Sequence, residues 1–281
     1  MSALSIRNVW VQYGEQIVLE RIGLEIDSGS FVAVVGPSGC GKTTFLRLLL
    51  GQERPSRGSI LLDGQPMPGE PGPDRGVVFQ RYSVFPHLTV LGNVLLGAEL
   101  ASSPLLGRLF GARRRKAKEE ARALLAEVGL DGAAAKYPAQ LSGGMQQRLA
   151  LAQALIRKPR VLLLDEPFGA LDPGIRGEIH VLMRQLWHET GVTVVMVTHD
   201  LREAFSLATR VVVFDRQRKL PEEQLRYGAS ITQNIAVHRR RGAEPESELE
   251  TEFQPERISN SGRDDPASTE RTCRDDPAST H

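Results

Sequence analysis

An eight-residue segment, residues 36–43, constrains the fold of this chain more than any other feature of its sequence. It fits the pattern G-x-x-x-x-G-K-[ST] and reads Gly36-Pro37-Ser38-Gly39-Cys40-Gly41-Lys42-Thr43. The apolar run at 31–35 predicts a buried strand before it, and the apolar spacing of 42–50, which Gly51 ends, predicts a helix after it. Backbone N–H groups between a strand and the positive end of a helix converge on anions. The segment therefore predicts a phosphate-binding loop.

Within this loop the side chains have distinct expected roles. Lys42 is expected to neutralise the outer phosphates of a nucleotide, and Thr43 to offer its hydroxyl to Mg²⁺. Cys40 needs to contribute only its backbone, and a redox role for it is not indicated. The residues expected to bind the nucleotide here are Gly36, Pro37, Ser38, Gly39, Cys40, Gly41, Lys42, Thr43 and Thr44.

The rest of the chain up to residue 219 alternates strand-like and helix-like patterns. Apolar runs at 161–164 and 192–197 predict two more buried strands, and 173–189 and 200–208 predict helices. Such alternation predicts an α/β fold with a mostly parallel sheet covered on both faces. Residues 86–158 break the alternation and predict a separate helical lobe.

Two adjacent acids, Asp165 and Glu166, follow the predicted strand at 161–164. Ligands of doubly wound sheets bind beside the carboxyl ends of the strands. Asp165 is therefore expected to hold Mg²⁺ through its water shell, and Glu166 to polarise a water molecule aimed at the outermost phosphate. Two solvated acids at a strand end would be the structural alternative, which the phosphate loop disfavours.

Composition excludes several other classes of protein. The 281 residues carry a net charge of +1, which argues against nucleic acid as a partner. Two cysteines, Cys40 and Cys273, do not make a disulfide framework. No apolar run approaches the roughly 18–20 residues of a membrane span, and residues 1–7 lack the pattern of a signal peptide. The composition predicts a cytosolic globular protein.

The end of the sequence differs from the part before it. From Leu220 onward there are 8 basic and 13 acidic residues, and apolar periodicity stops near Phe214. We therefore expect one domain at 1–219 and an acidic, disordered extension at 220–281. The extension contains a short repeat, at 263–269 and again at 274–280.

A second motif points to a particular family. The segment Leu141-Ser142-Gly143-Gly144-Met145-Gln146-Gln147-Arg148 resembles the signature motif of the ATP-binding cassette (ABC) family. In that family Ser142, Gly143 and Gly144 would contact the ATP held by a partner subunit, through N–H groups at a helix start. Taken alone, Ser142 is also an ordinary helix N-cap.

Other motifs of the family occur in the expected order. Gln80 resembles the glutamine that contacts Mg²⁺ and the attacking water, and 170–172 resemble the loop that follows the catalytic acid. His199 resembles the switch histidine that contacts the γ-phosphate. Tyr13 resembles the aromatic residue that stacks on adenine, although a strand tyrosine is often only a packing residue. The resemblance covers about residues 4–216.

The resemblance implies a P-loop ATPase with an N-terminal antiparallel sheet, a parallel core and a helical subdomain. It implies ATP and Mg²⁺ as cofactors, Glu166, His199, Gln80 and Lys42 as catalytic residues, and Thr43, Gln80 and Asp165 as the metal site. One loop and one signature imply a homodimer that energises separate membrane permease subunits from the cytoplasmic face of the inner membrane. An importer would add an extracytoplasmic solute-binding protein.

The transported substrate is left open by the sequence. Residues 186–191 and 197–200 resemble the nitrate, sulfonate and taurine subgroup, whereas 84–89 resemble polyamine and sulfate cassettes. An exporter or lipid-transfer cassette is the alternative, and a soluble cassette that acts on ribosomes or DNA is a further one.

Two surface features could contact the membrane or its proteins. Apolar side chains directly after Gln80 could receive a permease helix or could pack inside the helical lobe, and they are Tyr82, Val84, Phe85, Pro86 and Leu88. The basic run at 113–118 within the 102–118 insertion is either a solvated helix start or an approach to anionic lipid, and 238–241 allows the same two interpretations.

Overall fold

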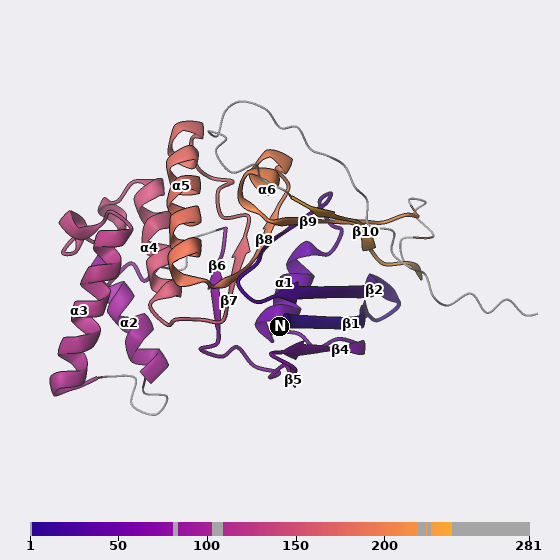
Figure 1. Cartoon of the computed structure of the whole chain (residues 1–281), viewed down its shortest axis with the longest axis horizontal. Helices are drawn as coiled ribbons and strands as arrows, with labels where there is room; N and C mark the ends of the chain where they lie inside the picture. Colours follow the sequence, from indigo (N-terminus) through magenta and orange to yellow (C-terminus); the bar gives the residue numbers. More distant parts are fainter. Residues whose placement is uncertain (1, 81–83, 103–108, 219–222, 224–225, 238–281) are drawn as a thin grey trace, which may run out of the picture.

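The computed structural model describes residues 2–80, 84–102, 109–218, 223 and 226–237 (Figure 1). Its strands form two sheets. The antiparallel sheet has the order β2 (Gln16–Asp27), β1 (Ser2–Tyr13), β4 (Arg57–Leu62) and β5 (Gln65–Pro66). The larger sheet has the order β10 (Ser230–Ala236), β9 (Arg210–Asp215), β3 (Phe31–Val35), β8 (Thr193–Thr198), β7 (Val161–Asp165) and β6 (Arg75–Val78).

The core of the larger sheet is parallel, as the sequence predicts. Strand β3 pairs in parallel with β8 on one side and β9 on the other, and β7 pairs in parallel with both β6 and β8. Val35 lies opposite Thr198, and Asp165 lies opposite Val197. The carboxyl ends of β3, β7 and β8 therefore meet at one edge of the sheet, where a ligand of such a fold binds.

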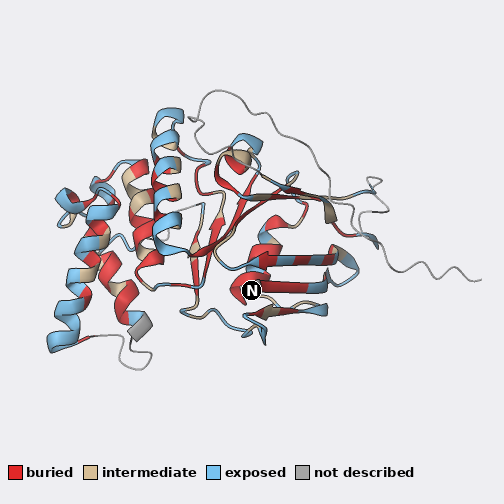
Figure 2. Ribbon diagram, viewed as in Figure 1, coloured by how far each residue is buried: buried red, intermediate tan, exposed pale blue. Residues whose placement is uncertain are grey.

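Burial on both faces explains why the central strands are continuously apolar. All five residues of β3 and all six of β8 are buried (Figure 2). Ala33 and Leu164 pack into the core shared with the helical side, whereas Val34 and Leu163 pack into the core shared with the antiparallel sheet and α1. Alternation along each strand divides the side chains between two cores.

Helix α1 (Lys42–Leu50) lies between the two sheets, and Phe45 and Leu49 fill the core there. Gly51 ends it in the left-handed conformation, with φ 80°. Helices α5 (Pro173–Thr190) and α6 (Leu201–Leu207) follow β7 and β8. All three helices agree with the predicted segments to within two residues.

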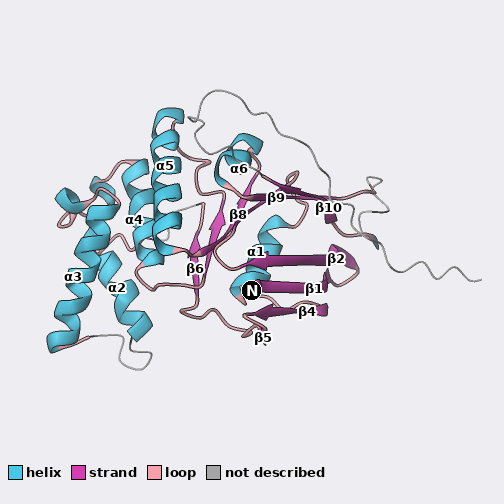
Figure 3. Ribbon diagram, viewed as in Figure 1, coloured by secondary structure: helices cyan, strands magenta, loops and turns pink. Residues whose placement is uncertain are grey.

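The remaining helices gather beyond strand β6, on the left of Figure 3. They are α2 (Val90–Ser102), α3 (Gly111–Glu127) and α4 (Gly143–Leu155), with 3₁₀ turns at Asp131–Ala133 and Pro138–Gln140. Helix α2 packs on α3 and α4, and α4 also packs on α5 and β6. This part of the described chain corresponds to the segment 86–158, in which helices are expected.

The expected domain end at residue 219 is too early. Strand β10 pairs antiparallel with β9, with Ile235 opposite Val211, and it extends the larger sheet to residue 236. Ala229 before it is fully buried and bonds to Val18. Polar residues in the middle of β10 hide its edge-strand pattern in the sequence. The acidic segment and repeat expected beyond residue 237 lie outside the described residues.

Candidate active site

The phosphate loop joins β3 to α1, and close packing favours glycine at two of its positions, Gly36 and Gly41. Gly41 has φ 92°, a left-handed conformation, and a Cβ there would stand 2.7 Å from Leu19 Cδ2. A Cβ on Gly36 would stand 2.2 Å from the carbonyl oxygen of Phe214. The loop is therefore held against both sheets, so that its backbone N–H groups keep a fixed arrangement at the start of α1.

Lys42 lies inside this loop. Its side chain is buried, and Nζ donates hydrogen bonds to the carbonyl oxygens of Gly36, at 2.7 Å, and Pro37, at 3.0 Å. These neutral acceptors hold the ammonium group but leave its charge without a carboxylate partner in those contacts. Burial raises the pKa of the neighbouring Cys40 thiol, which agrees with a backbone role for that residue.

Asp165 and Glu166 reach the same edge of the sheet from β7. Burial raises the pKa of Asp165, the charge of Glu166 raises it further, and Arg47 and Lys42 on α1 oppose both effects. Glu166 has φ 45°, a left-handed conformation that is uncommon outside glycine. Its N–H donates to the carbonyl of Val197 at 2.9 Å, which fixes this turn against β8. Such strain at a strand end is characteristic of functional residues.

His199 follows β8 and meets Glu166. Its Nδ1 lies 3.4 Å from Glu166 Oε1, with 63% of the histidine side chain and 25% of the glutamate side chain exposed. A small pocket contains both residues, together with Gly169 and Thr198. Two residues that were predicted from separate motifs thus form one site.

Gln80 reaches the same loop from β6. The side-chain Nε2 of Gln80 lies 4.0 Å from the position that a Cβ on Gly169 would occupy. Gly169 N–H in turn donates to the carbonyl of Glu166 at 3.3 Å. Gln80 is therefore a near neighbour of the loop that begins at Glu166. Among the described contacts, no hydrogen bond joins the side chains of Gln80 and Glu166.

Tyr13 stands at the end of β1, and 49% of the residue is exposed. Its hydroxyl donates to Glu53, which also pairs with Arg47 at 3.4 Å. Burial and this glutamate raise the pKa of Tyr13. The hydroxyl of Tyr13 is anchored, and about half of the residue remains exposed. Stacking of adenine on this ring stays a prediction.

The signature residues begin α4, on the other side of β6 and β7 from α1 in Figure 1. Ser142 caps this helix by accepting from Met145 N–H at 3.4 Å, so the ordinary N-cap contact is made. A Cβ on Gly144 would stand 2.5 Å from Ile175 Cγ2, which requires glycine where α4 meets α5. Ser142 and Gly143 are both exposed.

Sequence reasoning missed a polar group beside His199. Arg176, Asp200 and Glu203 line the same small pocket as Glu166. The position of Asp200 before α6 is a recognisable N-cap signal, because it accepts from Arg202 N–H at 2.8 Å. Nothing in the spacing of the sequence places Arg176 there, since it approaches from a different helix.

A glycine-rich loop at a helix start, beside two acids at the end of a parallel strand, defines a nucleotide-binding protein of the P-loop α/β class. A family model described as ABC transporter matches residues 19–169. The chain belongs to the ABC transporter family.

Named relatives are ATP-binding proteins of importers. The taurine import ATP-binding protein TauB of Escherichia coli O157:H7 is 45% identical over 210 residues, which are 75% of this chain and 78% of that protein. The sulfate/thiosulfate import ATP-binding protein CysA of Bradyrhizobium diazoefficiens is 44% identical over 217 residues, 76% of this chain and 62% of that protein. The aliphatic sulfonates import ATP-binding protein SsuB of Burkholderia pseudomallei is 45% identical, and the match spans 61% of it. The chain thus spans somewhat less than two thirds of two of these relatives.

Solved structures give the same fold. The dimeric structure of MJ0796, a bacterial ABC transporter cassette, has a TM-score of 0.67 and 31% identity over 84% of this chain and 99% of that one. A post-hydrolysis state of MJ0796 bound to ADP and Pi has a TM-score of 0.66 and 30% identity, with the same coverage. Among the described residues of the present chain, no helix has the length and apolar content needed to cross a membrane.

Proposed function

We propose that this chain is the ATP-hydrolysing subunit of an ABC importer for a small sulfur oxyanion. The observation that carries the ATPase activity is the contact between Glu166 and His199 at the edge of the sheet where the phosphate loop begins. The substrate class rests on the taurine, sulfonate and sulfate importers among the relatives. Taurine, aliphatic sulfonates and sulfate each carry a sulfonate or sulfate group, which favours such a substrate over a polyamine.

In this proposal each part of the edge acts on ATP. The N–H groups of the loop and the ammonium of Lys42 bind the phosphates, and Tyr13 stacks on the adenine. Glu166 orients the attacking water and accepts its proton, while His199 contacts the γ-phosphate and steadies Glu166. Gln80 holds the water from the side of β6.

Mg²⁺ fits the side chains at this edge, because the donors are all oxygen atoms. The hydroxyl of Thr43, the carboxyl of Asp165 and the amide oxygen of Gln80 would hold it. Burial raises the pKa of Asp165, and a nearby cation would favour its ionised form. When bound, Mg²⁺ would neutralise charge on the phosphate oxygens.

The exposed signature residues support a homodimer, in which Ser142 and Gly143 of one subunit contact the ATP of the other. The dimeric relative supports the same assembly. We further propose that the dimer binds membrane permease subunits at the cytoplasmic face of the inner membrane and works with an extracytoplasmic solute-binding protein.

Uptake of radiolabelled taurine, ethanesulfonate, sulfate and putrescine by cells with and without the gene tests the substrate class. Complementation with Lys42→Ala serves as the matched control for ATP dependence. In cells without the gene we expect uptake of at least one sulfur oxyanion to be lost and uptake of putrescine to be unchanged. Loss of putrescine uptake alone, or uptake that Lys42→Ala restores, would contradict the proposal.

A further inference from the structure

Arg176, near the start of α5, contacts three residues in two other segments of the chain. Its Nη2 donates to the carbonyl oxygen of Leu171 at 3.3 Å, in the loop that precedes α5. Its Nη1 lies 3.4 Å from Asp200 Oδ2, and its Nε lies 3.6 Å from Glu203 Oε1. One side chain thus links the loop before α5 to the segment that carries His199.

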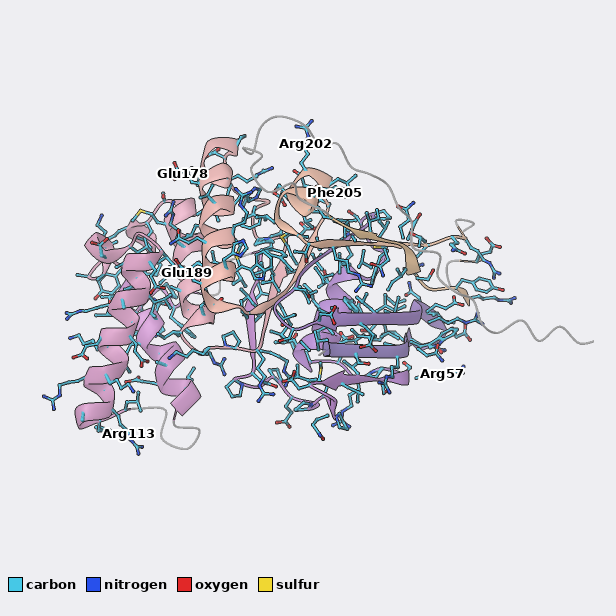
Figure 4. All side chains as sticks on the ribbon, viewed as in Figure 1. Arg57, Arg113, Glu178, Glu189, Arg202 and Phe205 are labelled. Carbon is cyan, nitrogen blue, oxygen red and sulfur yellow. The ribbon has the colours of Figure 1, made fainter. Side chains whose placement is uncertain are left out.

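Figure 4 labels residues on both helices that this link involves, α5 and α6. Glu178 near the start of α5 and Arg202 on α6 lie toward the same upper edge of the molecule, whereas Glu189 near the end of α5 lies lower. Arg176 comes two residues before Glu178, so its side chain starts from the end of α5 that is close to α6.

The backbone on both sides of His199 depends on the same contacts. Thr198 Oγ1 donates to Glu203 Oε2 at 2.8 Å and accepts from Asp200 N–H at 3.0 Å. Asp200 also caps α6. Thr198, which precedes His199, and Asp200, which follows it, thus belong to one hydrogen-bonded network with Glu203. Arg176 ion-pairs with both acids of this network.

His199 itself is poorly enclosed. Its side chain is 63% exposed, and it meets Glu166 at 3.4 Å in a pocket that Arg176 also lines. Because little else surrounds the imidazole, its place relative to Glu166 is set mainly by the neighbouring backbone. A change in the contacts of Arg176 would therefore move the ring.

We propose that Arg176 is a positioning residue that holds His199 against Glu166 and transmits shifts of the loop at Leu171 to this pair. The proposal rests on the ATPase activity proposed above and deepens it. Glu203 gives an electrostatic reason for an arginine at position 176. Glu203 is only 4% exposed, and its ionised form is costly without a nearby cation. Arg176 supplies this charge on one side, with Asp200, His199 and Thr198 as the other polar neighbours.

The test compares Arg176→Gln, Arg176→Lys and His199→Ala with the double variant Arg176→Gln/His199→Ala. Arg210→Gln is the matched control, because Arg210 also bonds a side chain, Asn234, and a carbonyl, that of Glu25, far along β9 from the site. Asp200→Asn is a second variant that keeps the helix cap but removes the ion pair. Steady-state kcat and KM for ATP and the melting temperature are measured for each.

A positioning role predicts that Arg176→Gln lowers kcat about 10- to 100-fold with little change in KM, since it displaces a catalytic group rather than a binding one. Arg176→Lys and Asp200→Asn should lose less, and Arg210→Gln should keep the wild-type kcat. The double variant should be no slower than His199→Ala alone. An unchanged kcat in Arg176→Gln, or losses that multiply in the double variant, would overturn the proposal.

A second readout does not depend on hydrolysis. The chain has six histidines, so the imidazole NMR signal of His199 is assigned by its loss in His199→Ala. This signal should shift or broaden in Arg176→Gln and return toward its wild-type position in Arg176→Lys. An unmoved His199 signal overturns the positioning role, whether or not the wild-type chain hydrolyses ATP. Absence of ATPase activity in the wild-type chain would by itself contradict only the proposed function. If Arg176→Gln does not fold, Asp200→Asn decides both readouts.

Discussion

His199 Nδ1 lies 3.4 Å from Oε1 of Glu166, and the two residues come from the ends of neighbouring parallel strands. The contact exists because β7 and β8 run in the same direction and end at the same edge. Glu166 is fixed by a bond to the backbone of β8, from which His199 continues. The pairing of acid and histidine is therefore a property of the sheet topology.

Dimerisation should require ATP, and it should require that the N-terminus of α4 be accessible to the partner's nucleotide. In the hydrolysis-deficient variant Glu166→Gln, ATP with Mg²⁺ should convert monomer to dimer in sedimentation velocity runs. Adding Gly143→Glu should abolish this conversion, because a carboxylate would face the partner's phosphates, although an acid at a helix start does not harm the fold. Gly132→Glu is the control, because Gly132 is exposed and a Cβ there would have no atom within 4 Å. A dimer that persists in Gly143→Glu would count against the signature assignment.

Phe85 should contribute to permease binding rather than to stability. Phe85 is 38% exposed, whereas Val84 packs on the core and Tyr82 lies outside the described residues. Phe85→Ala should change the melting temperature little and reduce co-purification with the permease. A buried phenylalanine would instead lose about 3–5 kcal/mol of stability.

Asn93→Ala provides the contrast to Phe85→Ala. Asn93 is fully buried and bonds the backbone of Phe85, Leu88 and Thr89. Its loss should unfold this turn and lower the melting temperature. Normal permease binding by a stable Phe85→Ala variant would refute the docking surface.

Stability should fall in mild acid partly because of His180. Burial, with help from Arg176 and Arg184, lowers the pKa of His180 to about 4, from 6.5. Between these values the unfolded chain binds a proton that the folded chain does not, so stability rises with pH through this window and is retained above it. Two and a half units correspond to at most about 3 kcal/mol, and partial exposure reduces this to about 1–2 kcal/mol.

His180→Phe tests this account, since Phe168 already packs edge-on against the ring at 4.6 Å. Between pH 7 and pH 5 the melting temperature of this variant should fall less than that of the wild type. Equal slopes for the two proteins would assign the acid sensitivity to other groups.

The sequence predicted the parts of this structure that repeat a strong local pattern. The phosphate loop, the buried strands and the helices at 42–50, 173–189 and 200–208 have clear periods and glycine or N-cap boundaries. Strand β10 was missed because its polar middle and edge position give no apolar period. Sheet edges carry weaker signals than central strands, which are buried on both faces.

In the candidate site, too, residues with a local sequence pattern were predicted and residues placed by tertiary packing were not. Residues within motifs, such as Lys42, Glu166 and His199, were predicted because their types and spacing have a chemical meaning. Arg176 has no such signal, since its role depends on how α5 packs beside α6. The burial that shifts the pKa of Asp165 and His180 likewise arises only from tertiary packing.

The most direct test of the central claim is the single-turnover rate of ATP hydrolysis by Glu166→Gln beside that of the wild-type chain. Glutamine keeps the size of the side chain but does not accept a proton, so the rate should fall about 10²–10⁴-fold. ATP affinity, measured by equilibrium titration, should stay near the wild-type value because Lys42 and the loop are untouched. Hydrolysis by Glu166→Gln at close to the wild-type rate would contradict the assignment of Glu166 as the catalytic carboxylate.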